Sequence, residues 1–209
     1  MSNYAYVATR ARSRRSRLLP AEAYNQLLNL EHAEIARYIQ DLEYRREIDR
    51  YGSTLSGADL IETALVDNLA RDVGDFLSFS KGKLRDILHV YAEKYRIENL
   101  KNIVRGINQN MDKQNLERLV CPINDSDKEL YNKLYDSKTV EDMISSLEGT
   151  SYYNPLKKAL EARNSDSLQP LEDALDLIYY QNLVSNQPSG GADVEVYRDF
   201  VQLKVDIAN

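Results

Sequence analysis

The sequence predicts an all-α protein, and three observations support that fold class. The 209 residues include only 8 glycines and 5 prolines, and residues 21–121 contain no proline. Apolar residues recur at the three- and four-residue intervals of a helix along most of the chain. No segment shows the alternation of apolar and polar residues that is typical of a strand. Because 43% of the residues are apolar, the expected helices can bury a core.

The chain is predicted to begin with a basic amphipathic helix. Its first 20 residues contain five arginines and no acidic residue, although the whole chain has a net charge of −6. The apolar residues among the arginines recur at roughly helical spacing, namely Tyr4, Val7, Ala8, Ala11 and Leu18. The arginines can therefore line the solvent side of a helix. An alternative hypothesis is nucleic-acid binding by Arg10–Arg17, but the acidic remainder of the chain argues against it.

Further helices are predicted up to residue 80. Pro20 is suited to the first position of a helix, where its missing N–H costs nothing, and Leu27, Leu28 and Leu30 follow it. A short apolar face runs over residues 35–42. After a loop over 51–57, Ser56 is the expected cap of a long helix with an apolar stripe over residues 60–77.

Two apolar stripes follow, over residues 84–95 and 97–104, and Gly106 is predicted to end them. A polar connector over 106–111 leads to a short helical stretch before Cys121 and Pro122.

The second half of the chain repeats the pattern of the first half. Residues 140–147 resemble 35–42 at an offset of 105, whereas 171–175 resemble 61–65 and 194–205 resemble 84–95 at an offset of 110. Three segments in the same order indicate an internal duplication of a helical unit of about 110 residues. The predicted domains are therefore residues 1–110 and 111–209.

No motif with the spacing of a catalytic or cofactor-binding site occurs in the sequence. Cys121 is the single cysteine, which excludes a disulfide and a cysteine-based zinc site. Phosphate-binding glycine loops and nucleophile elbows are missing, as is any apolar run of about 18 residues. Glu62 and Glu172, at repeat-equivalent positions, could serve a small helical enzyme, although solvated acids in the first turns of helices also explain them. We expect no cofactor, no metal and no nucleotide site.

Residues 95–105, with the sequence YRIENLKNIVR, resemble the C subunit of archaeal-type rotary ATP synthases, which is related to the d subunit of vacuolar ATPases. That family carries a tyrosine, usually an aspartate, and then N-[IL]-K-x-[IL]-[LV]-R. Asn99, Lys101 and Arg105 match this pattern, whereas Arg96 stands in place of the usual aspartate. Looser resemblances at residues 3–7, 171–180 and 204–209 extend the similarity over nearly the whole chain.

The resemblance implies a funnel-like array of three similar helical domains around a pseudo-threefold axis, of which this chain would hold about two, so that we expect it to be truncated. It also implies a non-catalytic central-stalk part of the rotor, which couples the membrane ion-translocating ring to the central shaft during proton- or sodium-driven ATP synthesis. The implied partners are ring and shaft subunits, without nucleic acid or nucleotide. The implied location is peripheral, on the cytoplasmic face of an archaeal or bacterial cell membrane. Candidate interface residues are Asn99, Lys101, Arg105, Arg12 and Arg15.

Overall fold

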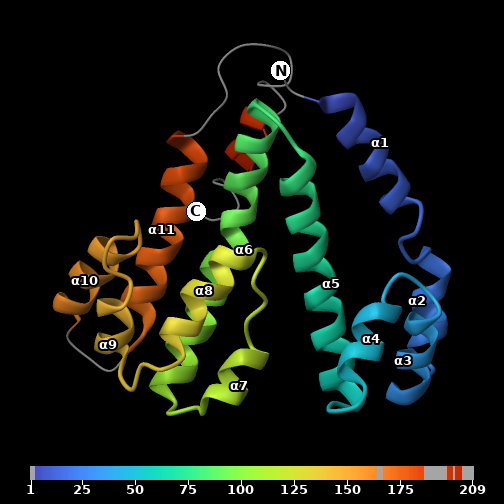
Figure 1. Cartoon of the computed structure of the whole chain (residues 1–209), viewed down its shortest axis with the longest axis horizontal. Coiled ribbons are helices and arrows are strands. Elements are labelled where there is room, and N and C mark those ends of the chain that lie inside the picture. The colour runs from blue at the N-terminus through green and yellow to red at the C-terminus, as the bar shows by residue number, and fades with distance from the viewer. Residues whose placement is uncertain (1–2, 164–166, 186–196, 200, 204–209) are drawn as a thin grey trace. The chain divides into compact units, whose positions relative to one another are not determined.

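The structure is a computed structural model that describes residues 3–163, 167–185, 197–199 and 201–203. All regular secondary structure in these residues is helical, which confirms the predicted all-α class. The chain divides into two compact units, residues 1–80 and 81–209. Figure 1 shows the helices in chain order.

The first unit is organised around one long helix with shorter helices packed against it. Its helices are α1 (Tyr4–Arg15), α2 (Ala21–Leu27), α3 (His32–Gln40), α4 (Arg45–Tyr51) and α5 (Gly57–Phe79). The helices α3 and α4 pack against α5 and against each other. Their shared core is small and consists of Ala36, Ile39, Ile48, Leu60 and Ala64. Ser56 precedes α5, as predicted, although its side chain makes no capping hydrogen bond.

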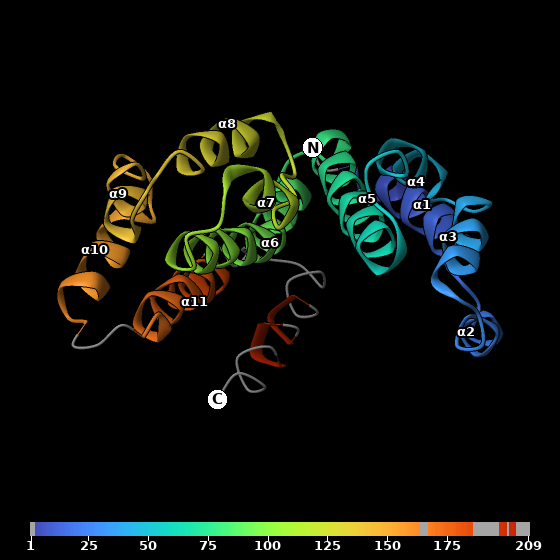
Figure 2. The same ribbon diagram turned by 90° about the horizontal axis from the view of Figure 1, so that it is seen from below.

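The second unit has a larger core around a pair of long helices. Its helices are α6 (Lys83–Asn108), α7 (Lys113–Arg118), α8 (Asp125–Leu134), α9 (Val140–Ser145), α10 (Tyr153–Glu161) and α11 (Gln169–Ser185). The helices α6 and α11 lie side by side, as Figures 1 and 2 both show. Buried side chains of α6, such as Ile97 and Val104, share one core with Leu171 and Leu175 of α11. This packing ties the middle of the chain to its later part.

The predicted helix end at Gly106 is wrong, because α6 continues past this residue. The two apolar stripes form one helix of 26 residues, because no helix-breaking residue separates them, and the helix continues to Asn108. Gly106 is buried, and a Cβ atom at this position would lie 2.3 Å from Cδ2 of Leu116 in α7. The glycine therefore permits a close approach of α7. The left-handed residue after α6 is Asn110, with φ of 53°.

The prediction of a helix that starts at Pro20 and buries Leu27, Leu28 and Leu30 is also wrong in two respects. Pro20 is the residue that precedes α2 and not its first residue. Leu28 is 83% exposed, and Leu27 and Leu30 are only half-buried. Neither compact core includes this short helix, so its leucines have little to pack against within the described residues.

The boundary between the compact units differs from the domain boundary that the repeat predicts. The units divide after residue 80, because α6 packs against α7, α9 and α11, whereas the repeat divides the chain after residue 110. The order of elements nevertheless follows the repeat, since the short helices α3 and α4 precede the long α5 as α9 and α10 precede α11. The duplication itself stays a prediction. Half of the helix predicted over 194–205 lies outside the described residues, and the described half, 197–199 and 201–203, is helical.

Candidate interface site

Lys101 and Arg105 of α6 bind two acidic residues of α11. Lys101 Nζ lies 2.6 Å from Asp176 Oδ1. Arg105 donates from Nε to Glu172 Oε1 at 2.8 Å and from Nη2 to Glu172 Oε2 at 2.7 Å. Because the later residue on α6 meets the earlier residue on α11, the two helices run antiparallel. Lys101 is 7% exposed, so its charge is largely enclosed between these helices.

The Arg105 pair also changes the acidity of its carboxylate partner. The hydrogen bonds from Arg105 hold the pKa of Glu172 below its ordinary value of 4.5, and the charge of Arg105 adds to this effect. Glu172 therefore remains ionised, which is unlike a general acid whose pKa is raised. The exposed Glu62 lies in the other unit, on α5, and makes no ion pair with a described residue. Glu172 thus does not show the raised pKa that the enzyme hypothesis requires.

Asn99 holds the backbone of the segment between α7 and α8. Its Nδ2 donates to the Cys121 carbonyl at 2.9 Å, and its Oδ1 accepts from the Cys121 N–H at 3.2 Å. The side chain is buried, and Nδ2 also lies 3.5 Å from the Tyr131 hydroxyl. Both the Nδ2 and the Oδ1 atom of Asn99 are thus hydrogen-bonded within the chain. Asn99 therefore positions the segment around Cys121.

A further polar cluster on α6 was missed by the sequence analysis. Arg96 donates from Nε to Asp127 Oδ1 of α8 at 2.8 Å and from Nη1 to Glu93 Oε2 at 3.2 Å. Glu93 in turn accepts a hydrogen bond of 2.5 Å from the Tyr152 hydroxyl. Burial raises the pKa of Asp127, and the charge of Arg96 opposes that rise. The arginine that departs from the family pattern thus has two acidic partners.

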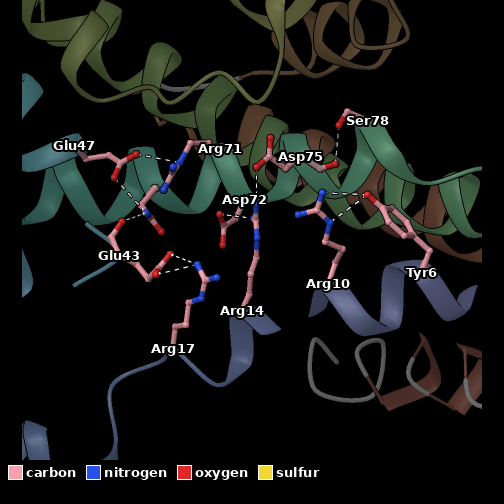
Figure 3. A network of polar contacts seen from close by, with 11 residues as sticks. Tyr6, Arg10, Arg14, Arg17, Glu43, Glu47, Arg71, Asp72, Asp75 and Ser78 are labelled. Carbon is pink, nitrogen blue, oxygen red and sulfur yellow. Dashed lines mark hydrogen bonds and ion pairs between the residues drawn. The ribbon is translucent and has the colours of Figure 1, made fainter. Parts of the chain in front are cut away.

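Two of the five arginines at the start of the chain, Arg14 and Arg17, form ion pairs within the first unit, as Figure 3 shows. Arg14 of α1 forms ion pairs with Asp72 and Asp75 of α5. Its guanidinium also lies over the Phe76 ring, 5.2 Å from the ring centroid. Arg17 donates to both carboxylate oxygens of Glu43, at 3.0 and 3.1 Å. The Arg14 pairs attach α1 to α5, whereas the Arg17 pair joins the segment after α1 to the segment between α3 and α4. Both arginines are thereby less available to a nucleic acid.

Figure 3 also shows a buried acid, Glu47, beside Arg71. Glu47 of α4 is 2% exposed and lies 3.0 Å, by its Oε1, from Nε of Arg71 in α5. Its other oxygen accepts a hydrogen bond of 3.2 Å from Asn68 Nδ2. Since a buried carboxylate is costly without partners, this arrangement fixes α4 against α5.

Arg12 and Arg15 differ from their neighbours on α1. Both side chains are exposed, and neither forms an ion pair with any residue that the structure describes. Arg15 lies at the wall of a cleft of about 280 Å³ within the first unit, which Arg14, Arg17 and Asp72 also line. The predicted interface residues are therefore divided between the two compact units. Asn99, Lys101 and Arg105 lie on α6 with separate partners, and Arg12 and Arg15 lie on α1 in the other unit.

Two classes of site do not occur in the described part of the chain. No group of three or more histidine, cysteine, aspartate or glutamate side chains that could hold a metal is found there. No helix among the described residues has the length and apolar character needed to cross a membrane.

Comparison with known proteins decides the family. The ATP synthase (C/AC39) subunit family matches residues 7–209. The chain belongs to this family of ATP synthase subunits. Residues 95–105, which carry the family-like pattern, lie in the second half of α6. There Asn99 binds the backbone at Cys121, and Lys101 and Arg105 bind α11.

Relatives of the C/AC39 family with similar sequences come from several archaea. The chain is 34% identical to the C subunit of the A-type ATP synthase of Archaeoglobus fulgidus over 99% of its length, which is 58% of that protein. It is 34% identical to the corresponding protein of Haloferax volcanii and 35% identical to that of Haloquadratum walsbyi, over its whole length and 60% of each relative. The chain thus spans about three fifths of the length of these relatives.

Proposed function

We propose that the protein is a non-catalytic central-stalk part of an A-type ATP synthase, which couples the membrane ion-translocating ring to the central shaft. The observation that carries this proposal is the family match over residues 7–209, with relatives that are named as C subunits of A-type ATP synthases. The proposed partners are ring and shaft subunits, and the proposed location is peripheral, at the cytoplasmic face of the cell membrane. Nucleotide chemistry belongs to other subunits in this account.

The contacts of α6 support a mechanical role. Three different segments hold this helix, since Arg96 binds α8, Asn99 binds the backbone at Cys121, and Lys101 binds α11. A close-packed interior transmits strain instead of absorbing it. A long helix that is fixed on several sides is therefore suited to pass torque from one partner to another.

The candidate interface residues divide into two roles under this proposal. Arg12 and Arg15 are exposed and have no acidic partner among the described residues, so they are the side chains that would meet an acidic surface of a partner. Asn99 and Lys101 are buried, and Arg105 is tied to Glu172. These three residues would support assembly indirectly, because they fix α6 in the position in which a partner subunit binds it.

Pull-down from membrane extract tests the proposal. A tagged chain is expected to recover ring and shaft subunits, and the double substitution Arg12→Glu and Arg15→Glu is expected to lower that recovery. Arg37→Glu with Arg46→Glu is the matched control, because these arginines are also exposed in the first unit. Recovery of RNA in place of both subunits, by a chain that circular dichroism shows to be helical, would refute the proposal.

A further inference from the structure

The attachment of α1 to α5 depends on charged side chains. Arg14 of α1 pairs with Asp72 and Asp75 of α5, and its guanidinium lies over the Phe76 ring. Neither acid is buried. Both helices belong to the first compact unit, so these contacts do not depend on where the second unit lies.

The first turns of α1 are held in a similar way. The Arg10 guanidinium lies 5.5 Å from the centroids of both the Tyr6 ring and the Phe79 ring of α5. Arg10 also donates to the Tyr6 hydroxyl at 3.1 and 3.2 Å, as Figure 3 shows. Before the helix, Asn3 Nδ2 donates to the Phe79 carbonyl at 2.8 Å. Cation–π and polar contacts thus continue the arginine contacts along α5.

Apolar burial contributes little to this attachment. Val7 is the buried side chain of α1, and neither core of the described residues includes a residue of this helix. The helices α3 and α4, in contrast, pack against α5 through a core that includes Ile39, Ile48 and Leu60. The helix α2, which follows α1, lies outside both cores as well. Departure of α1 from α5 would therefore leave the core of the first unit closed.

We propose that α1 is a strap that docks on α5 by charge and is released as a separate unit when those charges are screened. When docked, it covers the α5 face that carries Asp72, Asp75, Phe76 and Phe79. After release, its 12 residues unfold, because isolated helices below about 12–15 residues are marginal in water. Release thus uncovers that face of α5 while α3, α4 and α5 stay folded. The proposal does not rest on the rotor function.

Salt distinguishes this attachment from an apolar one. The screening length falls from about 10 Å at about 0.1 M salt to about 3 Å at about 1 M, which weakens the pairs of Arg14. It also weakens the pair between Arg17, directly after α1, and Glu43. Screening of charge does not weaken the apolar core that α3 and α4 share with α5. High salt should therefore release α1 alone.

Tryptic cleavage of the full chain tests the proposal. Trypsin cleaves after arginine, and all five arginines of residues 1–20 lie on α1 or directly after it. Mass spectrometry follows cleavage there and within α3–α5, and a free peptide of residues 1–20 corrects for the effect of salt on the protease. Between about 0.1 M and about 1 M potassium chloride, we expect cleavage of α1 to rise about tenfold, because cleavage follows the population of the opened segment. Cleavage within α3–α5 should stay unchanged.

Neutral variants of the two acids identify the contacts that hold the strap. Asp72→Asn combined with Asp75→Asn should raise the cleavage of α1 at low salt and remove most of its salt dependence. Asp59→Asn combined with Glu62→Gln is the matched control, because it removes the same charge from the other end of α5. This control should behave like the wild type.

Three results would overturn the proposal. The first is cleavage of α1 in the wild-type chain that salt leaves unchanged. The second is cleavage of α1 that rises only together with cleavage within α3–α5, since α1 would then not separate from the rest of the first unit. The third is a salt dependence that the variant with both Asp72→Asn and Asp75→Asn retains in full.

Discussion

Arg105 binds Glu172 through two parallel hydrogen bonds, one helical turn along α6 from the contact between Lys101 and Asp176. A step of four residues forward on α6 is matched by a step of four residues back on α11. These two pairs therefore fix the register of the antiparallel helices as well as their contact. A shift by one residue would rotate both acids away from both bases.

Exchanging the charges of Arg105 and Glu172 tests whether this ion pair fixes the register of α6 against α11. We expect Arg105→Glu to lower the free energy of unfolding by about 1 kcal/mol, which is the upper range for a partly exposed pair, and to lower the melting temperature by about 2–4 °C. The double variant with Glu172→Arg should recover most of the loss. The sequence contains no tryptophan, so far-ultraviolet circular dichroism is the readout. A double variant as unstable as the single one would contradict the register role.

The same pair predicts an acid-dependent loss of stability. The pKa of Glu172 is lower in the folded chain than its ordinary value, so the unfolded chain binds more protons as the pH falls. The stabilisation is present above the ordinary glutamate pKa and is lost as the pH falls through the lowered pKa. Urea unfolding between about pH 6 and about pH 3 should show a shallower pH dependence for Glu172→Gln than for the wild type. Equal slopes would contradict the prediction.

The sequence predicted the helices far better than it predicted their contacts. Helical periodicity and the position of Ser56 predicted where α5 begins, because these are local properties of the chain, although Ser56 makes no capping hydrogen bond. The stop at Gly106 was wrong, since its glycine serves a contact with Leu116 that no local pattern shows. The partner of Lys101 lies 75 residues away, and it could be found only once the register of α6 against α11 was known.

Gly106 should tolerate no side chain while Leu116 is present. Gly106→Ala adds helix propensity of about 1 kcal/mol but places a methyl group against Leu116 Cδ2, and overpacking of this kind costs about 1–3 kcal/mol. We therefore expect a net loss of stability. In a Leu116→Ala background, the same change should be neutral or stabilising. Urea unfolding of the four proteins gives the coupling energy, and additive effects would contradict the close approach.

Removal of Arg96 should be more costly than removal of an exposed arginine. Asp127 is 7% exposed, and Arg96→Ala would leave its carboxylate buried without a counter-charge, at a cost of about 3–5 kcal/mol. The control Arg85→Ala removes an exposed arginine from the same helix and should change stability by less than about 0.5 kcal/mol. Thermal unfolding of both variants checks this prediction. Similar melting temperatures would mean that Asp127 finds other partners.

The basic segment shows what charge patterns can and cannot predict. Arg10 and Arg14 are four residues apart on α1, and Asp72 and Asp75 are three residues apart on α5, so each helix presents its charges on one face. The sequence analysis placed the arginines on the solvent side of a helix and did not predict the ion pairs of Arg14 with Asp72 and Asp75. It could not show that Arg12 and Arg15 would lack acidic partners among the described residues, because their surroundings depend on how the helices pack.

Ion pumping by a reconstituted A-type ATP synthase tests the central claim most directly. Vesicles that contain the complex without this protein should still hydrolyse ATP, because catalysis belongs to other subunits, but they should not acidify or accumulate the transported ion. Addition of the protein should restore pumping without a matching rise in the hydrolysis rate per catalytic head. Pumping that proceeds unchanged without it would contradict its proposed role as the link between ring and shaft.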